Sequence, residues 1–102
     1  DKRRKVMVKL LNEIPGLKCP TPKGAFYAFP DISGIFGKNG NGKTIENADQ
    51  FTDYLLESVH VAVVPGTGFG APNCIRLSYA TSMANIEKGL ERIRQAVNKL
   101  SS

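Results

Sequence analysis

One arginine, Arg76, has neighbours that would let it bind an anion. Alternation of apolar and polar residues over Cys74–Tyr79 predicts a strand. Its two faces would carry Ile75, Leu77 and Tyr79 on one side and Cys74, Arg76, Ser78 and Ala80 on the other. Small residues beside Arg76 leave room for a ligand, and a planar guanidinium suits a carboxylate bound through two hydrogen bonds. If this face is buried, the charge requires an anionic partner; if it is solvated, Arg76 is an ordinary surface residue. Periodicity alone leaves both interpretations open.

A second segment, Gly37–Thr44, matches the nucleotide-binding pattern G-x-x-x-x-G-K-[ST]. A working phosphate loop follows a buried strand directly and opens a helix at its Lys-Thr step. Here the preceding residues, 30–36, are interrupted by Pro and Gly, and the next helix is predicted to begin only at Asn47. We therefore expect an exposed loop, with a P-loop-like nucleotide binder as a less favoured alternative.

The glycine-rich run Gly66–Gly70 lacks the G-x-G-x-x-G spacing of a dinucleotide site and is predicted to connect two strands. We expect a tightly turned loop near a ligand. Cys19, Cys74 and His60 are too far apart in sequence for a metal-binding motif, so no metal site is predicted. Two isolated thiols favour a reducing, cytoplasmic setting, although the pair could form one disulfide.

The net charge of +5 does not predict a nucleic-acid-binding surface. Four of the 14 basic residues fall within residues 2–5, and no basic stripe interleaved with aromatic residues follows them. A charge run at a helix start is most often a solvated face, so no nucleic-acid partner is expected. No apolar run reaches the roughly 20 residues of a membrane span, so no membrane partner is expected either.

The elements that would position these residues follow from periodicity and turn signals. We predict a helix over Lys2–Ile14, a well-buried strand over Ala25–Phe29, a long loop over Ser33–Thr44, a helix from an Asn47 cap to Glu57, strands over Val61–Val64 and Cys74–Tyr79, and a last helix capped by Ser82. This order predicts a two-layer α/β (α+β) sandwich, in which helices cover a small sheet of about three strands.

Apolar spacing predicts which helix faces are buried. The stripe of the last helix is formed by Ile86, Leu90, Ile93, Val97 and Leu100, and that of the first by Val6, Leu10 and Ile14, with Met7 and Leu11 beside it. The second helix should bury Phe51, Tyr54, Leu55 and Ser58.

The length of 102 residues predicts one domain, residues 1–102, with a core too small to enclose a deep ligand pocket. A small-molecule site would then be completed by a second domain. The chain begins at Asp1, inside a helical pattern, so we expect a fragment of a longer polypeptide.

Three segments together resemble a known family. Gly24–Tyr27, Val61–Gly66 followed by Phe69-Gly70, and Ile75–Ser82 occur in the order and spacing of the C-terminal end of fold-type I aminotransferases (class I/II), especially prokaryotic-type aspartate aminotransferases. Leu11–Leu17 and the last helix extend the resemblance over nearly the whole chain, and Ser33–Thr44 is its least typical part.

The resemblance implies a role for Arg76 and for five further residues. In the family, the arginine of the R-L-S segment binds the α-carboxylate of the substrate, and the same role is implied for Arg76. The corresponding strand and loop border the entrance of the active site. Residues that would line the substrate site are therefore Gly24, Phe26, Gly66, Phe69 and Gly70.

The resemblance also implies the cofactor, pyridoxal 5′-phosphate, bound by a lysine of the large domain, which this chain lacks. The chain should thus hold no catalytic and no cofactor-binding residue and be inactive alone. The complete enzyme would be a cytoplasmic homodimer that transfers an amino group between an amino acid, aspartate or a similar one, and a 2-oxo acid. The alternative is a non-catalytic α/β module for a small ligand, in which Arg76 would still anchor an anion.

Overall fold

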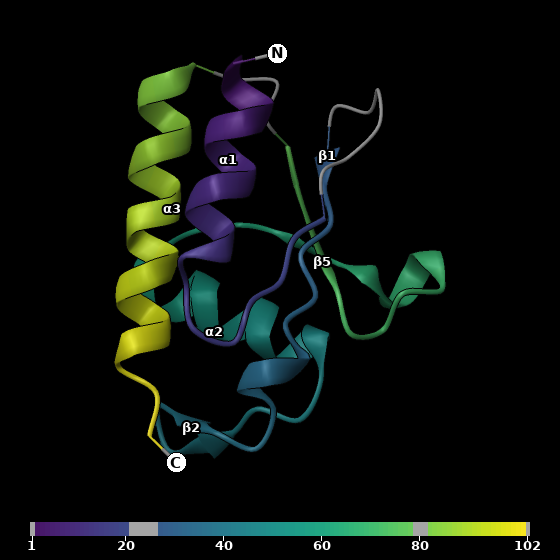
Figure 1. Cartoon of the computed structure of the whole chain (residues 1–102). Helices are drawn as coiled ribbons and strands as arrows, with labels where there is room; N and C mark the ends of the chain where they lie inside the picture. Colours follow the sequence, from purple (N-terminus) through teal and green to yellow (C-terminus); the bar gives the residue numbers. More distant parts are fainter. Residues whose placement is uncertain (1, 21–26, 79–81, 102) are drawn as a thin grey trace.

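The computed structural model describes residues 2–20, 27–78 and 82–101, shown in Figure 1. In chain order, the elements are α1 (Lys2–Asn12), β1 (Tyr27–Ala28), the 3-10 turn η1 (Ser33–Ile35), β2 (Asn39–Gly40), β3 (Lys43–Thr44), α2 (Ala48–Val59), β4 (Val64–Pro65), the 3-10 turn η2 (Gly66–Phe69), β5 (Ile75–Ser78) and α3 (Met83–Asn98). The predicted two-layer α/β arrangement is confirmed.

The sheet that carries Arg76 has three antiparallel strands in the order β1-β5-β4. Strand β5 is central, with Tyr27 opposite Ser78 on one side and Val64 opposite Arg76 on the other. The last two strands in the chain therefore pair with one another. Because β1 and β5 are far apart in sequence, the residues around Arg76 come together only when the whole domain folds.

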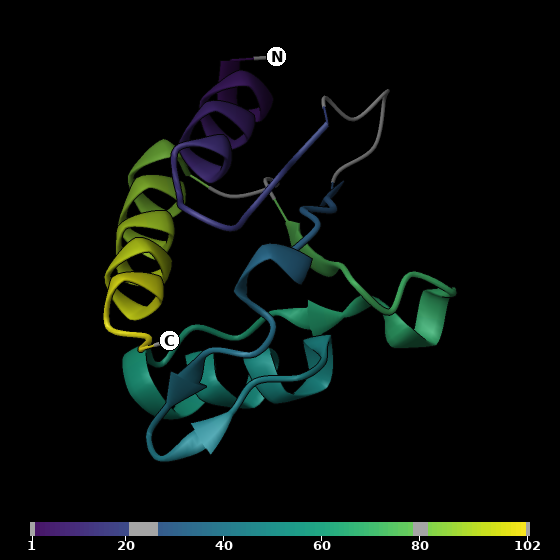
Figure 2. The same ribbon diagram turned by 60° about the horizontal axis from the view of Figure 1, so that its bottom comes forward.

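Helices cover one side of this sheet. In the two views of Figures 1 and 2, α1 and α3 lie side by side, and α2 lies near the C-terminal end of α3. Side chains from all three helices enclose a common core with β5. Its fully buried members include Leu11, Phe51, Leu55, Ile75 and Ile93.

Helix α3 begins and packs as the sequence predicts. The Ser82 side chain caps it by accepting a hydrogen bond of 3.2 Å from the backbone N–H of Asn85. The predicted stripe is buried at Ile86, Leu90, Ile93 and Val97, and Leu100 packs against its edge. The amphipathic period thus sets both the start and the orientation of this helix.

Helix α1 is rotated relative to the prediction. Met7 and Leu11 are its buried residues, whereas Val6 and Leu10 are only partly buried. The helix ends at Asn12, and Ile14, predicted to lie in its stripe, enters the core from the following turn. Two adjacent apolar stripes allowed either orientation, and packing against α3 selected the one with Met7 and Leu11.

Helix α2 starts at the predicted cap. The Asn47 side chain accepts a 2.8 Å hydrogen bond from the Gln50 backbone N–H, and the Gln50 side chain accepts one of 2.6 Å from the Glu46 backbone N–H. Phe51, Tyr54 and Leu55 are buried as predicted, whereas Ser58 is only partly buried.

The prediction of a long loop over Ser33–Thr44 is wrong. This segment contains η1 and the β2-β3 hairpin, whose turn residues Asn41 and Gly42 have φ of 53° and 79°. An Asn-Gly pair readily adopts these left-handed angles and is typical of a two-residue hairpin turn. The hairpin is held to the end of the chain by an antiparallel bridge between Asn39 and Ser101.

The hairpin also argues against the alternative of a P-loop-like nucleotide-binding site. Lys43 and Thr44 lie in strand β3, and α2 begins only at Ala48. The Gly37–Thr44 pattern therefore lacks the helix N-terminus that a phosphate loop requires.

Two predicted strands are shorter or more exposed than expected. Of Val61–Val64, only Val64 enters the ladder, together with Pro65. The prediction that Ala25–Phe29 is well buried is wrong for Tyr27 and Phe29, which are 38% and 39% exposed, whereas Ala28 is fully buried. Ala25 and Phe26 lie outside the described residues.

Candidate functional site

Arg76 lies on the face of β5 that points away from the core. Its neighbours in sequence face inward, with Ile75 fully buried and Leu77 half-buried against the core. Val64, directly opposite Arg76 on β4, is 38% exposed. The predicted alternation of faces along β5 is confirmed for residues 75–77, and it places a charged side chain on the central strand of the sheet.

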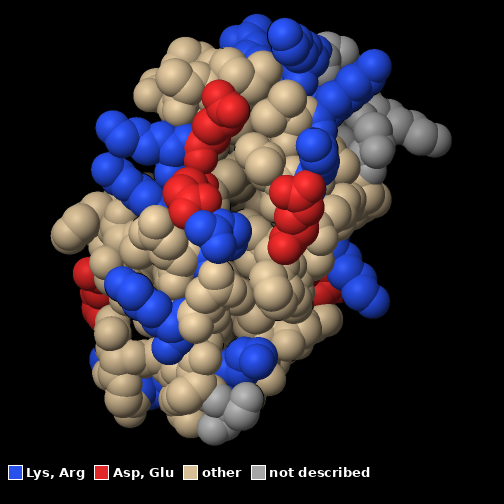
Figure 3. All heavy atoms as spheres, turned by 60° about the vertical axis from the view of Figure 1, so that its left-hand side comes forward, with Lys and Arg blue, Asp and Glu red and all other residues tan. Residues whose placement is uncertain are grey.

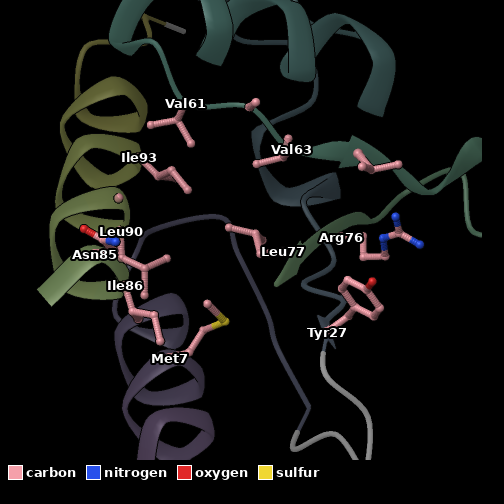
Figure 4. A pocket seen from close by; sticks show the side chains of 13 residues that line it. Met7, Tyr27, Val61, Val63, Arg76, Leu77, Asn85, Ile86, Leu90 and Ile93 are labelled. Atoms are coloured by element: carbon pink, nitrogen blue, oxygen red, sulfur yellow. The ribbon is translucent and has the colours of Figure 1, made fainter. Parts of the chain in front are cut away.

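Two aromatic rings contact the guanidinium of Arg76. Its central carbon, Cζ, lies 4.4 Å from the ring centroid of Tyr27 and 4.7 Å from that of Phe69. Both distances are within the range of attractive cation–π contacts. Figure 4 shows Arg76 and Tyr27 next to one another, on the side of β5 opposite the apolar residues of α1 and α3. The rings contact the face of the guanidinium and leave its N–H groups free of an ion pair within the described residues.

The N–H groups of Arg76 are available to a ligand. The side chain is half-buried, and it forms no ion pair with any carboxylate of the described residues. A guanidinium offers five N–H donors in a planar fork, and aromatic rings are weak acceptors for them. The site therefore has the chemistry of a carboxylate receptor whose ligand must come from outside these residues.

The loop after β4 brings Phe69 to Arg76. Its ends are joined by a 2.7 Å hydrogen bond from the Gly66 N–H to the Cys74 carbonyl, and the Ala71 N–H donates one of 2.9 Å to the Gly66 carbonyl. A Cβ atom on Gly66 would lie 2.3 Å from the Ala71 oxygen, and Gly70 has φ of 74°. Glycine is required at Gly66 for space and at Gly70 for conformation.

The residues predicted to line the substrate site thus fall into three groups. Phe69 contacts Arg76 directly, whereas Gly66 and Gly70 shape the loop that carries it. Gly24 and Phe26 lie outside the described residues. Tyr27 is not among the residues predicted to line the site, because its contact with Arg76 depends on the pairing of β1 with β5. Its adjacency to the Gly24–Phe26 segment was the available signal.

An apolar cavity of about 360 Å³ adjoins the site. Figure 4 shows its lining, which runs from Arg76 and Tyr27 past Leu77 to the facing side chains of α1 and α3, including Met7 and Leu90. The described residues that line the cavity are mainly apolar, and Arg76 is the one charged residue among them.

The described residues do not fit pyridoxal phosphate. The lysines among them are exposed or half-buried, and the pocket that Lys43 lines also holds the carboxylates Asp53 and Glu57, which would repel a phosphate. Among the same residues, no group of three or more His, Cys, Asp or Glu could hold a metal ion.

Cys19 and Cys74 are free thiols, so the alternative of a disulfide between them is not realised. Burial raises the pKa of each thiol above its ordinary value of 9.0. Neither thiol is therefore activated as a nucleophile by its surroundings.

Charged side chains alternate in sign over the face formed by α1 and α3. Figure 3 shows acidic groups between basic ones there, with basic side chains gathered at the end where α1 begins. None of the helices in the described part of the chain combines the length and apolar character needed to cross a membrane.

Comparison with known proteins gives the family. The family model described as "Aminotransferase class I and II" matches residues 1–93. The aspartate aminotransferase of Rhizobium meliloti (strain 1021) is 48% identical over 102 residues, covering 99% of this chain and 25% of the relative. A protein of Rickettsia prowazekii (strain Madrid E), named "Probable aspartate/prephenate aminotransferase", is 44% identical over 101 residues, covering 98% of this chain and 25% of the relative.

A solved structure agrees with these relatives. A crystal structure of the aspartate aminotransferase from Rhizobium meliloti superimposes with a TM-score of 0.96 at 48% identity, covering 98% of this chain and 25% of that one. The chain spans about a quarter of the length of the curated relatives it matches. The fold, with β5 at the centre of a helix-covered sheet, and the matches over nearly all its residues show that this chain belongs to the class I and II aminotransferase family.

Proposed function

We propose that this chain is the small, C-terminal, substrate-binding domain of a pyridoxal-phosphate-dependent aminotransferase, in which Arg76 binds the α-carboxylate of the substrate. The observation that carries the proposal is the half-exposed guanidinium of Arg76, which two rings contact and no described carboxylate neutralises. Family membership supports amino-group transfer as the reaction.

In this proposal the chain contributes binding and orientation. Two parallel hydrogen bonds from Arg76 fix both oxygens of the carboxylate and thereby limit rotation about the bond to the substrate Cα. A fixed Cα holds its C–H bond in one direction relative to the group that removes the proton, which raises the fraction of productive complexes. The cofactor supplies the electron-withdrawing chemistry when the rest of the enzyme binds it.

We further propose aspartate, or an amino acid of similar shape and charge, as the amino donor and a 2-oxo acid as the acceptor. The names of the Rhizobium and Rickettsia relatives support this substrate class. The described residues that line the cavity beside Arg76 include no second basic side chain. We therefore assign recognition of the substrate side chain to the large domain or to the second subunit of a cytoplasmic homodimer.

The first test is the visible absorption spectrum of a longer polypeptide that contains this chain, recorded before and after addition of aspartate. We expect a cofactor band that shifts when aspartate is added. A colourless protein that stays inactive after addition of pyridoxal phosphate would contradict the proposed function.

The second test removes the guanidinium. In the longer polypeptide, Arg76→Ala should lower kcat/KM for aspartate by about 30- to 1,000-fold, since truncating one partner of a hydrogen-bonded charge pair costs about 2–4 kcal/mol. Arg76→Lys keeps the charge but loses the planar fork, and its kcat/KM should lie between those of the parent and of Arg76→Ala. Unchanged kcat/KM in Arg76→Ala would remove the proposed role while leaving family membership intact.

A third test concerns the isolated chain, which we propose to be inactive. Incubation with one equivalent of pyridoxal phosphate followed by borohydride should label no single lysine stoichiometrically, because the described lysines are exposed or half-buried and form only weak Schiff bases with no preference for one site. Labelling of one lysine at one equivalent would contradict this expectation.

A further inference from the structure

The contacts of Arg76 with Tyr27 and Phe69 raise the question of what the two rings do. Both rings are themselves exposed, Tyr27 by 38% and Phe69 by 53%, although aromatic side chains of this size usually bury more of their surface. Their exposure is therefore not explained by the core. Each ring instead contacts the guanidinium of Arg76.

The rings reach Arg76 from two independent elements. Tyr27 is placed by pairing of β1 with β5, where it lies opposite Ser78 and diagonal to Arg76. Phe69 is placed by η2 and the hydrogen bonds that close the loop between Gly66 and Cys74. The β1–β5 pairing and the closed loop after β4 thus each place one ring against the same guanidinium.

This convergence has an effect on ligand binding. A free arginine side chain loses much rotamer freedom when it forms a fixed pair of hydrogen bonds. Rings at 4.4 and 4.7 Å restrict that freedom before a ligand arrives, and they leave the N–H donors unused. Restricting a binding group in advance improves affinity, because less entropy is lost on association.

We infer that Tyr27 and Phe69 are positioning residues that hold the guanidinium of Arg76 ready for the substrate carboxylate. The inference rests on the proposed function and deepens it, since it assigns carboxylate affinity to three side chains rather than one. Tyr27 and Phe69 act through Arg76 and need not touch the reacting atoms.

The test uses the complete enzyme that contains this chain and replaces each ring with leucine, which keeps an apolar side chain but removes the aromatic face. Tyr27→Leu and Phe69→Leu should each raise KM for aspartate by roughly 2- to 10-fold, with kcat nearly unchanged, as expected for loss of one cation–π contact. Tyr27→Phe and Phe69→Tyr keep an aromatic ring at each position and should have the same KM as the parent. Leu56→Ala, which truncates a side chain of the same 53% exposure on α2, is the matched control and should leave KM unchanged.

The outcomes separate this inference from the proposed function. If Arg76→Ala is impaired while both leucine variants match the parent, the inference is wrong and the proposed function stands. If Tyr27→Leu and Phe69→Leu lower kcat at constant KM, the rings only stabilise the fold, and the inference is again wrong. If Arg76→Ala itself has the parent's kcat/KM, the proposed role of Arg76 is wrong, and the inference that depends on it is wrong as well.

Discussion

The hydroxyl of Tyr54 in α2 donates a hydrogen bond of 2.7 Å to the backbone carbonyl of Ala96 in α3. Both residues are buried, and the bond joins two helices that lie far apart in sequence. Tyr54 also packs against Gly40 of the β2-β3 hairpin, so that one side chain connects three elements. This end of the domain therefore depends on a polar contact as well as on apolar packing.

Replacing Tyr54 with phenylalanine should lower the free energy of unfolding by about 1 kcal/mol, since the Ala96 carbonyl loses a buried partner. The change is measured by urea denaturation at neutral pH. Tyr27→Phe, which alters a tyrosine outside the core, is the control and should be within about 0.5 kcal/mol of the parent. Equal stability of the two variants would show that the Tyr54 bond contributes nothing.

Alkaline pH should weaken the same bond. Burial raises the pKa of Tyr54 above its ordinary value of 10.0. A group with a raised folded-state pKa stabilises the fold fully below its unfolded pKa and loses that contribution as pH rises through the folded value. Stability of the parent should therefore fall above about pH 10 more steeply than that of Tyr54→Phe, as followed by thermal unfolding at several pH values.

The Asn47 cap should be needed for the stability of α2. Asn47→Ala leaves the Gln50 N–H without its acceptor and should cost about 1 kcal/mol of unfolding free energy. Asn47→Asp keeps a side-chain oxygen at the same place and should retain most of the stability. If both variants lose the same amount of unfolding free energy, the Asn47 amide stabilises the protein by some means other than capping.

Acid should remove a contribution from Asp31. Hydrogen bonds from Ser33, from its side chain and its backbone N–H, lower the pKa of Asp31 below its ordinary value of 3.8. A lowered folded-state pKa means that the stabilisation is present above the unfolded pKa and is lost as pH falls through the folded value. NMR titration should show Asp31 ionising below pH 3.8, and Ser33→Ala should move its pKa upward. An unchanged pKa in Ser33→Ala would contradict this cause.

Two glycines of η2 should differ in their tolerance of a methyl group. A Cβ at Gly66 would meet the Ala71 and Cys74 carbonyl oxygens at 2.3 and 2.8 Å, whereas one at Gly68 would meet nothing within 4 Å. Gly66→Ala should therefore lower the free energy of unfolding by about 1–3 kcal/mol, and Gly68→Ala should stay within about 0.5 kcal/mol. Thermal unfolding of the pair measures both, and similar values would show that the loop adjusts freely.

Helix boundaries and caps could be predicted because their signals are local. The Ser82 and Asn47 caps lie within three residues of the N–H groups they bind, and the stripe from Ile86 to Val97 repeats over about three turns. Strand β5 was also predictable, because alternation fixes the faces of Ile75, Arg76 and Leu77 whatever its partners are.

What could not be predicted depends on contacts between distant segments. The rotation of α1 depends on α3, and the β2-β3 hairpin is held by Ser101 at the far end of the chain. The rings around Arg76 come from β1 and η2, and nothing in the local sequence of β5 indicates either. The hairpin within Ser33–Thr44 has a local turn signal in Asn41-Gly42, but its two-residue strands carry no apolar alternation that would predict them.

The alternation along β5 ties the proposed function to correct folding. If β5 paired with its neighbours one residue out of step, Arg76 would enter the core, and Ile75 and Leu77 would face water. An unpaired buried charge costs several kcal/mol, and exposing each aliphatic side chain costs a further 1.5–3 kcal/mol or so. Mispairing would thus bury the same guanidinium that the ligand requires, at a cost in free energy. Selection for ligand binding by Arg76 therefore also disfavours the misaligned strand pairing.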